Sequence, residues 1–313
     1  MGLLKNRWFL GFAGLYALAV AWLVASGTYS AAEPLAILAI FGVLLPLSAG
    51  WLCRKCQPIR VRIDFRPAEI VAVAGCVLFI TAYLVWGSGW VDGLLAPLTD
   101  DSPRLAYLLK IARKLVVFVV LPYLLFAWLF GYSWRDYGLS RDFRSVFAPR
   151  YLVLLLVLAC LYSLVQVLVG QGARPLFRGD YAIGSVLAGI LLLYPLLVIE
   201  VGLVEEFFFR AIVQARLAAW FKSEAAGLFG MAVIFGLAHA PGLYLRGAGS
   251  VTALGSNPGA LTAAAYAIAI LSLAGLTFGV IWARTRNLLV LMLIHACVDL
   301  LPGLPEFIDT FGF

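Results

Sequence analysis

The sequence contains very little charge. Of its 313 residues only 12% are Asp, Glu, Lys or Arg, whereas 64% are apolar, and the mean hydropathy is +1.00. A soluble globular domain carries about 25% charged residues. The composition therefore excludes an ordinary soluble protein and predicts an all-α polytopic membrane helical bundle.

Long basic runs, basic-aromatic patches and disulfide patterns are also missing from the sequence. The net charge of +7 is spread over the segments between apolar stretches, as the positive-inside rule requires of a membrane protein. We therefore expect no nucleic-acid partner. The five cysteines form no disulfide framework, and the lone pair Cys53-x-x-Cys56 cannot complete a four-ligand zinc site by itself.

Apolar stretches long enough to cross a bilayer alternate with polar loops, and about 20 residues suffice for one helical crossing. They predict eight or nine transmembrane helices, in the ranges 8–26, 35–52, 69–86, 106–132, 151–169, 181–217, 224–240, 260–283 and 287–301. The range 181–217 is too long for one simple span. Because proline breaks or kinks helices, we expect a short helix before Pro195 and a spanning helix after it. Pro241 and Pro302 are expected to close the two later helices.

The chain is expected to form one integrated membrane domain. Its parts are the N-terminal transmembrane helices at 1–180, a catalytic helical core at 181–301 and a short C-terminal tail at 302–313. If the N-terminus is inside, 16 of the 23 basic residues lie on the inner side, which predicts a cytoplasmic N-terminus. The strong excess of Arg over Lys, with abundant Ala, Leu, Val and Gly, favours a bacterial source and therefore the inner membrane.

An acidic motif, Glu205-Glu206-Phe207-Phe208-Phe209-Arg210, lies deep inside an apolar stretch, where charged side chains are expensive to bury. Positions i and i+4 share one face of a helix, so Glu206 is expected to pair with Arg210 as a supporting ion pair. Glu205 points to a neighbouring face and is left without a local partner. A buried, unpaired carboxylate is suited to act as a general base near neutral pH.

The chain has only two histidines, and both lie in apolar stretches. Phe235 lies one helical turn before His239, and Asp299 lies one turn after His295. We expect Glu205 and both histidines to converge on one intramembrane polar cavity. There Glu205 can accept a proton from water and His239 can hold that water, while His295 and Asp299 face the carbonyl oxygen of a peptide.

These three patterns, Glu-Glu-x-x-x-Arg, Phe-x-x-x-His and His-x-x-x-Asp on successive membrane helices, resemble the CPBP family. That family comprises CAAX-type prenyl-protein endoproteases and bacteriocin-processing enzymes and is also called the Abi family. The resemblance covers about 181–301, and the stretch Trp134–Leu139 is similar to an element ahead of the family core. It implies a glutamate-dependent intramembrane endopeptidase, with Glu205 and His239 activating water and His295 and Asp299 forming the oxyanion hole.

The chain departs from the family pattern at one position. The well-studied CAAX enzymes have Asn at the last position of the third pattern, where this chain has Asp299. An ionised Asp cannot donate a hydrogen bond, so Asp299 is protonated, orients His295 or binds a metal. We expect no cofactor. The alternative is a zinc ion held by two histidines and two carboxylates, namely Glu205, His239, His295 and Asp299. The sequence has no His-Glu-x-x-His motif that would favour this alternative.

Two other classes of function stay open at this point. A proton-coupled transporter would also bury charged residues, and Glu200 could extend a proton path towards Glu205. A catalytically silent membrane scaffold or immunity protein would need no chemistry at all. For an endopeptidase, the expected partner is a membrane-anchored protein or peptide precursor in the lipid bilayer, and prenylation of that substrate is not required. The sequence leaves the oligomeric state open.

Overall fold

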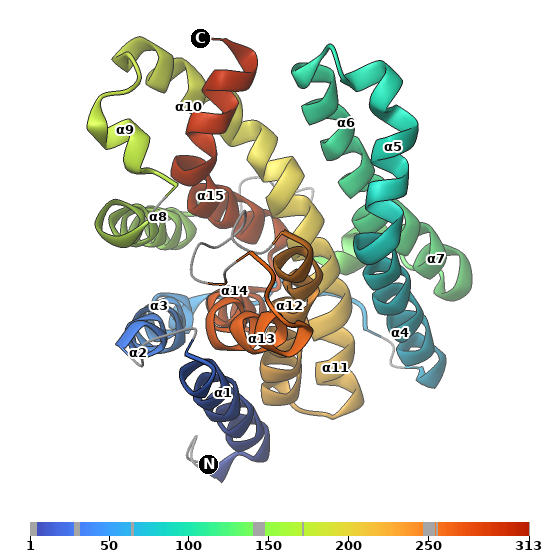
Figure 1. Cartoon of the computed structure of the whole chain (residues 1–313). Coiled ribbons are helices and arrows are strands. Elements are labelled where there is room, and N and C mark those ends of the chain that lie inside the picture. The colour runs from blue at the N-terminus through green and yellow to red at the C-terminus, as the bar shows by residue number, and fades with distance from the viewer. Residues whose placement is uncertain are drawn as a thin grey trace. The chain divides into compact units, whose positions relative to one another are not determined.

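The structure is a computed structural model, and it describes residues 5–27, 32–63, 66–139, 148–170, 172–246, 254 and 256–312. Residues 140–147, which lie between the predicted spans 106–132 and 151–169, are outside this range. The described residues contain helices and loops and no strand, which confirms the all-α prediction (Figure 1). Within them, nine helices are long and apolar enough to cross a membrane, at the upper end of the expected eight or nine.

The helices of the first half of the chain begin at α1. In order they are α1 (Arg7–Ala25), α2 (Ala32–Ile37), η2 (Leu38–Leu44), α3 (Leu45–Leu52), η3 (Cys53–Lys55), α4 (Pro67–Ala82), η4 (Tyr83–Gly87), α5 (Ser88–Thr99), α6 (Pro103–Leu115), η5 (Val116–Val120), α7 (Leu121–Phe130), η6 (Trp134–Tyr137) and α8 (Pro149–Val169). Segments η2, η4 and η5 are π-helical and connect α-helical segments without a break.

The helices of the second half contain the three motifs. They are α9 (Arg174–Arg178), α10 (Ile183–Leu197), η8 (Val198–Leu203), η9 (Glu206–Gln214), α11 (Ala215–Trp220), α12 (Glu224–Arg246), α13 (Ala260–Tyr266), η12 (Ala267–Leu271), α14 (Ser272–Thr285) and α15 (Leu288–Phe311). The acidic motif therefore lies at the junction of the π-helical segments η8 and η9.

The prediction that prolines end these helices is wrong at three positions. Pro195 lies inside α10, and one helical stretch runs from Ile183 to Trp220. Pro241 lies inside α12, and Pro302 lies inside α15, which continues to Phe311 through most of the expected C-terminal tail. Proline removes one backbone donor and clashes with the preceding turn. In an apolar environment an open backbone finds no water, so the helix re-forms, and after Pro195 it does so as the π-helical segment η8.

Residues 87–105 lie between the predicted spans 69–86 and 106–132 and are therefore expected to form a polar loop, but much of this stretch is helical. Helix α5 continues to Thr99, and the stretch from α4 to α5 is helical over 33 residues. Asp92, expected in that loop, lies in α5 and forms an ion pair with Arg113 of α6, with 2.6 Å between Oδ1 and Nη1. The ion pair connects α5 to α6.

The described chain divides into two compact units, each assembled from three separate segments of the sequence. The first unit comprises residues 1–51, 62–91 and 209–284, and its core is formed where α1 packs on α12 and α13. Phe12 and Phe229 lie 5.3 Å apart between their ring centroids in this core. Gly236 allows α12 to approach η12 closely, because a Cβ there would lie 2.7 Å from the carbonyl oxygen of Ala267.

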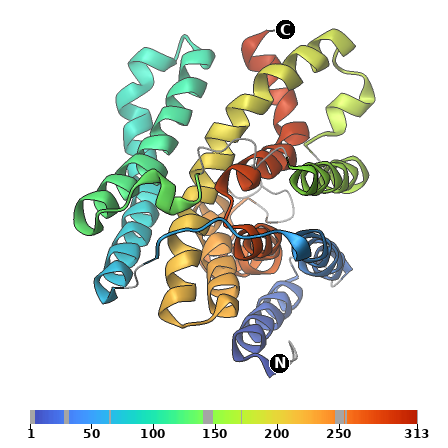
Figure 2. The ribbon, with the colours of Figure 1, turned by 180° about the vertical axis from the view of Figure 1, so that it is seen from behind.

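The second unit comprises residues 52–61, 92–208 and 285–313. In it α15 packs against α10, η8 and α8, and the contact of α15 with α10 can be followed from both sides (Figures 1 and 2). Leu193, Leu197 and Leu304 are buried between α10 and α15. The short helix η6 packs on the acidic motif, with 4.9 Å between the ring centroids of Tyr137 and Phe207. Both carboxylates of the acidic motif and one histidine belong to this unit.

Candidate active site

A glycine brings the helix of the acidic motif against the helix of the second histidine. A Cβ at Gly202 of η8 would lie 2.6 Å from the carbonyl oxygen of Met292 and 2.9 Å from its Cα. Real Cβ atoms essentially never approach so closely, so only glycine permits this contact between η8 and α15. Gly202 lies one turn before Glu206, and Met292 lies about one turn before His295. The close approach brings the two helices near enough for the Glu206 side chain to reach the His295 ring.

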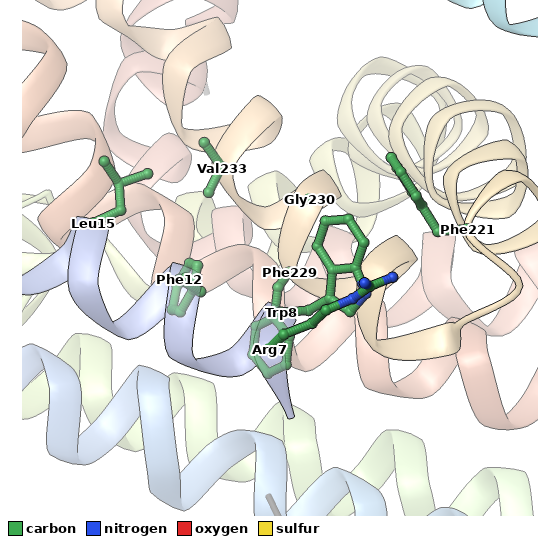
Figure 3. A pocket seen from close by; sticks show the side chains of 9 residues that line it. Arg7, Trp8, Phe12, Leu15, Phe221, Phe229, Gly230 and Val233 are labelled. Carbon is green, nitrogen blue, oxygen red and sulfur yellow. The ribbon is translucent and has the colours of Figure 1, made fainter. Parts of the chain in front are cut away.

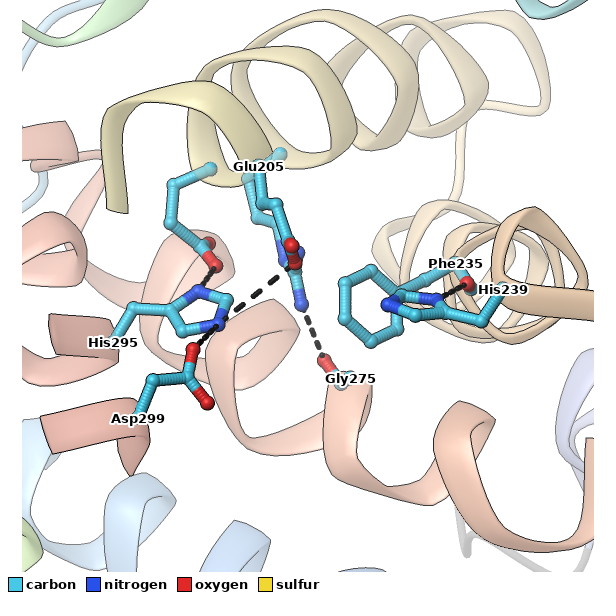
Figure 4. Close-up of polar contacts among 8 residues, drawn as sticks. Glu205, Phe235, His239, Gly275, His295 and Asp299 are labelled. Carbon is cyan, nitrogen blue, oxygen red and sulfur yellow. Dashed lines mark hydrogen bonds and ion pairs between the residues drawn. The ribbon is translucent and has the colours of Figure 1, made fainter. Parts of the chain in front are cut away.

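Three carboxylates surround the His295 ring in this unit (Figure 4). Its Nδ1 lies 2.5 Å from Oε1 of Glu206, which is a hydrogen bond with the ring nitrogen as donor and the carboxylate as acceptor. Its Nε2 lies 3.7 Å from Oδ2 of Asp299 and 3.8 Å from Oε2 of Glu205. The ring is thus held on one side, and its other nitrogen faces two carboxylates.

Burial decreases across this group. The Glu206 side chain is fully buried and that of His295 is 7% exposed, whereas 23% of Glu205 and 41% of Asp299 is exposed. Glu206 therefore anchors His295 from the closed side. Glu205, Asp299 and Nε2 of His295 form the side that water or a substrate can reach.

The separations of Nε2 of His295 from Asp299 and from Glu205 allow a third group, such as a water molecule, to contact all three side chains. A direct hydrogen bond between nitrogen and oxygen spans about 2.7–3.2 Å, so 3.7 and 3.8 Å are too long. Polar contacts across more than about 3.5 Å are commonly bridged by a water molecule. A water or a substrate oxygen near Nε2 of His295 would lie between an imidazole and two carboxylates, which together can accept and return protons.

The other predicted site residues form a group in the first unit. Nδ1 of His239 lies 2.8 Å from the carbonyl oxygen of Phe235, one turn earlier on α12 (Figure 4). Because a carbonyl oxygen only accepts, Nδ1 carries the proton, and in the neutral ring Nε2 keeps a lone pair. His239 is partly buried. Its free nitrogen can accept a hydrogen bond, as a residue that holds water must.

Arg210 is enclosed by aromatic rings and backbone. Its guanidinium carbon lies 4.5 Å from the centroid of the Phe235 ring and 5.3 Å from that of Phe278. Its Nη2 donates a hydrogen bond to the carbonyl oxygen of Gly275, at 3.3 Å. Phe235 also lies 4.9 Å from the His239 ring between centroids, so this one phenylalanine contacts both polar residues. The supporting role of Phe235 stays a prediction, and these two contacts show only that Phe235 lies next to both His239 and Arg210.

The structure brings part of the predicted site together. Glu205, Glu206, His295 and Asp299 lie within the second unit, and Arg210, Phe235 and His239 lie within the first. The predicted Glu206–Arg210 ion pair and the approach of His239 to Glu205 involve both units, and they stay predictions. Sequence reasoning missed the contact between Glu206 and His295, because the i, i+4 spacing offered Arg210 as a nearer partner.

Glu200, which could have extended a proton path, has partners of its own. Nζ of Lys114 lies 2.8 Å from its Oε1, and the Tyr107 hydroxyl donates to its Oε2 at 3.2 Å. Both partners come from α6, so the pair ties α6 to η8. Buried charges are usually matched in this way. A structural ion pair accounts for Glu200 without a proton path, which removes the observation that favoured a transporter.

Neither the metal alternative nor the cysteine pair gains a site in the described part of the chain. No group of three or more His, Cys, Asp or Glu residues there is arranged to hold a metal ion. Cys53 is buried, and burial raises the pKa of the Cys56 thiol above its usual value. A raised pKa lowers the thiolate fraction at neutral pH, so the Cys56 thiol is a poor nucleophile.

The comparisons with known proteins agree with the motif pattern. Residues 187–301 match the family model described as type II CAAX prenyl endopeptidase Rce1-like, and this confirms the resemblance to the CPBP family over that segment. The segment contains Glu205, His239, His295 and Asp299. Comparison with curated proteins and with solved structures found no match.

Proposed function

We propose that the Rce1-like segment makes this multi-pass membrane protein an intramembrane endopeptidase, which hydrolyses a peptide bond of a membrane-associated protein or peptide precursor. The observation that supports this function best is the group around His295. One imidazole, held by a buried carboxylate, presents its second nitrogen towards two accessible carboxylates within a membrane helix bundle. Hydrolysis of an amide needs a base and an oxyanion donor in one water-accessible place, and this group supplies both.

In the proposed reaction Glu205 is the general base. It accepts a proton from water while the water oxygen attacks the peptide carbonyl carbon. The carbonyl π-bond electrons move to the carbonyl oxygen, and a tetrahedral oxyanion forms. When that intermediate collapses, the carbon–nitrogen bond breaks and Glu205 returns the proton to the leaving amine nitrogen. Glu205 is thereby regenerated, and one water molecule is consumed for each bond cleaved.

His295 is the proposed oxyanion donor. A hydrogen bond from Nδ1 to Glu206 fixes the ring orientation, and a proton on Nε2 can then be donated to the oxyanion. With both nitrogens protonated the ring is an imidazolium, and Glu205, Glu206 and Asp299 supply the negative charge that stabilises such a cation. A preorganised donor of this kind stabilises charge where it develops in the transition state.

Of the three roles open to Asp299, we propose that it orients His295. Its carboxylate lies 3.7 Å from Nε2 and four residues after His295 on the same helix. From that position it can attract a protonated ring without donating a hydrogen bond itself. Direct oxyanion stabilisation is assigned to His295 alone.

His239 is proposed to hold the attacking water, with Arg210, Glu206 and Phe235 in support. The hydrogen bond to the Phe235 carbonyl leaves Nε2 of His239 able to accept from water, which supports this assignment. No metal takes part in the proposed reaction, and the test is direct. Cleavage by the purified protein should persist in a strong chelator, whereas complete loss that zinc restores would contradict the assignment.

The proposed location is a bacterial inner membrane with the N-terminus in the cytoplasm. The excess of Arg over Lys supports the bacterial source, and the distribution of basic residues supports the orientation. The proposed substrate is a membrane-anchored protein or peptide precursor, and prenylation is not required of it.

The experiment that tests this function compares membrane proteomes of cells that express wild-type protein, Glu205→Gln or Glu306→Gln. Glu306 is an exposed carboxylate on the same helix as His295 and serves as a matched control. The expected result is a set of processed termini that are present with wild type and Glu306→Gln and absent with Glu205→Gln. The same processed termini in cells expressing Glu205→Gln would refute the function.

A further inference from the structure

A pocket of about 540 Å³ lies in the first unit, at the N-terminal end of α1 (Figure 3). This volume falls in the range of about 300–1,000 Å³ that is typical of small-molecule sites. The pocket is formed where the start of α1 meets the turn between α11 and α12. Its residues include none of the predicted catalytic or supporting residues, so binding of a ligand there is independent of the proposed proteolysis.

The mouth of the pocket is cationic and aromatic. The Arg7 guanidinium carbon lies 5.2 Å from the centroid of the Trp8 ring, and Trp8 lies 4.5 Å from the Phe221 ring. In the part of the chain that the structure describes, no carboxylate pairs with Arg7. The turn after Phe221 carries one exposed cation, Lys222, and one exposed carboxylate, Glu224, so the charge at the mouth comes from Arg7. Trp and Arg at the end of a spanning helix are typical of the membrane–water interface.

The wall of the pocket is apolar and continues into the span. Gly11 and Leu15 line it from α1, and Gly230 and Val233 line it from α12 (Figure 3). Arg7 and Leu15 are separated by about two helical turns, or about 12 Å along the axis. A Cβ at Gly11 would meet nothing within 4 Å. The groove is therefore open along α1 and has a charged end and an apolar length.

We propose that this pocket binds an anionic glycerophospholipid, with its phosphate at Arg7 and an acyl chain along Gly11 and Gly230. The charge at the mouth favours an anionic headgroup over a zwitterionic one, and the groove below it offers apolar surface to an alkyl chain. Both walls are regular helices, whose backbone groups are already hydrogen-bonded and cannot pair with a peptide. The pocket lies on the side of the N-terminus, which the basic residues assign to the cytoplasmic leaflet, where anionic lipids attract cations.

The test is photo-crosslinking of the full-length protein in nanodiscs. One preparation contains phosphatidylglycerol with a diazirine on its acyl chain, and a parallel one contains the same label on phosphatidylcholine. Peptide mass spectrometry then locates the label. The expected result for wild type is labelling of α1 and α12 near Gly11 and Gly230 by the phosphatidylglycerol probe, with much weaker labelling by the phosphatidylcholine probe.

Two variants with matched controls sharpen this test. Gly11→Leu fills the groove, and Gly14→Leu is its control, because Gly14 is equally unobstructed on the same helix and does not line the pocket. Gly11→Leu should remove most of the label, and Gly14→Leu should leave it unchanged. Arg7→Gln should lower phosphatidylglycerol labelling about fivefold. Arg246→Gln, at the far end of α12, should not change it.

Several outcomes would overturn the proposal. Phosphatidylglycerol labelling of wild type that is no stronger at α1 and α12 than on the other lipid-facing helices, equal labelling by the two lipids, or equal labelling of Gly11→Leu and Gly14→Leu would each do so. Crosslinks between two protein copies at the pocket would show that a second chain occupies it. Because wild type alone already gives a decisive result, the test does not depend on how any variant folds.

Discussion

Two buried ionic groups in this protein are built differently. In the first unit, Nε of Arg216 lies 3.2 Å from Oε2 of Glu69, and neither side chain has any exposed surface. Arg216 also donates to the carbonyl oxygen of Ala211, at 2.5 Å. In the second unit, His295 is bonded directly only to Glu206 among its three carboxylate neighbours, and the other two are partly exposed.

This difference indicates that the closed Glu69–Arg216 pair has a structural role, whereas the open group around His295 is suited to chemistry. A closed pair is inaccessible to water, so its contribution is to hold α4 against α11. The open group keeps one nitrogen and two carboxylates within reach of a substrate, at separations too long for direct hydrogen bonds. Changes in the closed pair should therefore alter stability, and changes in the open group should alter cleavage.

The largest expected effect is on the closed pair. Arg216→Met leaves Glu69 as a buried charge without its main partner and should lower the free energy of unfolding by about 3–5 kcal/mol. Thermal or denaturant unfolding in detergent measures this loss. The double variant Glu69→Leu with Arg216→Met removes both charges and should recover much of the stability. If the double variant is no more stable than Arg216→Met, the loss of stability does not come from leaving the Glu69 charge unpaired.

His295→Asn tests the open group. Removing the proposed oxyanion donor should lower kcat about 10²–10³-fold. The expected change in unfolding free energy is smaller than that of Arg216→Met, because the Asn side-chain amide can still donate a hydrogen bond to the buried Glu206, whereas Met offers Glu69 no donor. Cleavage rates at matched folded fraction, with Glu306→Gln as the control, give the comparison. A variant that is strongly destabilised but cleaves normally once folded would reverse the assigned roles.

Gly202→Ala tests how the open group is assembled. Its new Cβ would collide with the backbone of Met292 and force η8 away from α15, at a loss of about 1–3 kcal/mol of stability. Cleavage should fall as well, because Glu206 moves away from His295. Gly184→Ala on α10 is the matched control, since a Cβ there meets nothing within 4 Å. Equal stability and equal cleavage rates of Gly202→Ala and Gly184→Ala would mean that the close approach of η8 to α15 does not position Glu206 against His295.

Asp299→Asn is expected to have the smallest effect. Partly exposed ion pairs contribute about 0.2–1 kcal/mol, so losing this charge should change the cleavage rate by less than about fivefold. The asparagine also restores the residue found in the well-studied CAAX enzymes. A loss of a hundredfold or more would show that Asp299 has a direct part in the chemistry.

Much of the fold could be predicted from hydropathy, because the bilayer imposes long apolar helices. The helix ends could not be predicted in the same way. In soluble proteins a proline often ends a helix because water can hydrogen-bond to the backbone groups that it leaves unpaired, and no such water is present in the bilayer. Pro195, Pro241 and Pro302 all lie inside helices. That each compact unit is drawn from three separate segments could not be predicted either, because hydropathy gives no signal for contacts between separate segments.

The candidate site was predictable as a set of residues and less so as an arrangement. Glu205, His295 and Asp299 were identified by the scarcity of polar residues in apolar stretches, and the structure brings them together. The contact of Glu206 with His295 was missed, because helical spacing reports neighbours on one helix and not across two. Gly202, which permits that contact, gives no signal in a single sequence beyond being a glycine.

The cleavage rate per folded molecule of Glu205→Gln, measured beside Glu69→Gln on the substrate found by proteomics, tests the central claim most directly. Glu205→Gln should cleave at least about 10²-fold more slowly than wild type with little change in melting temperature. Glu69→Gln should melt at a lower temperature and, once folded, cleave at the wild-type rate. A Glu205→Gln protein that cleaves at the wild-type rate would contradict the assignment of the chemistry to the open group.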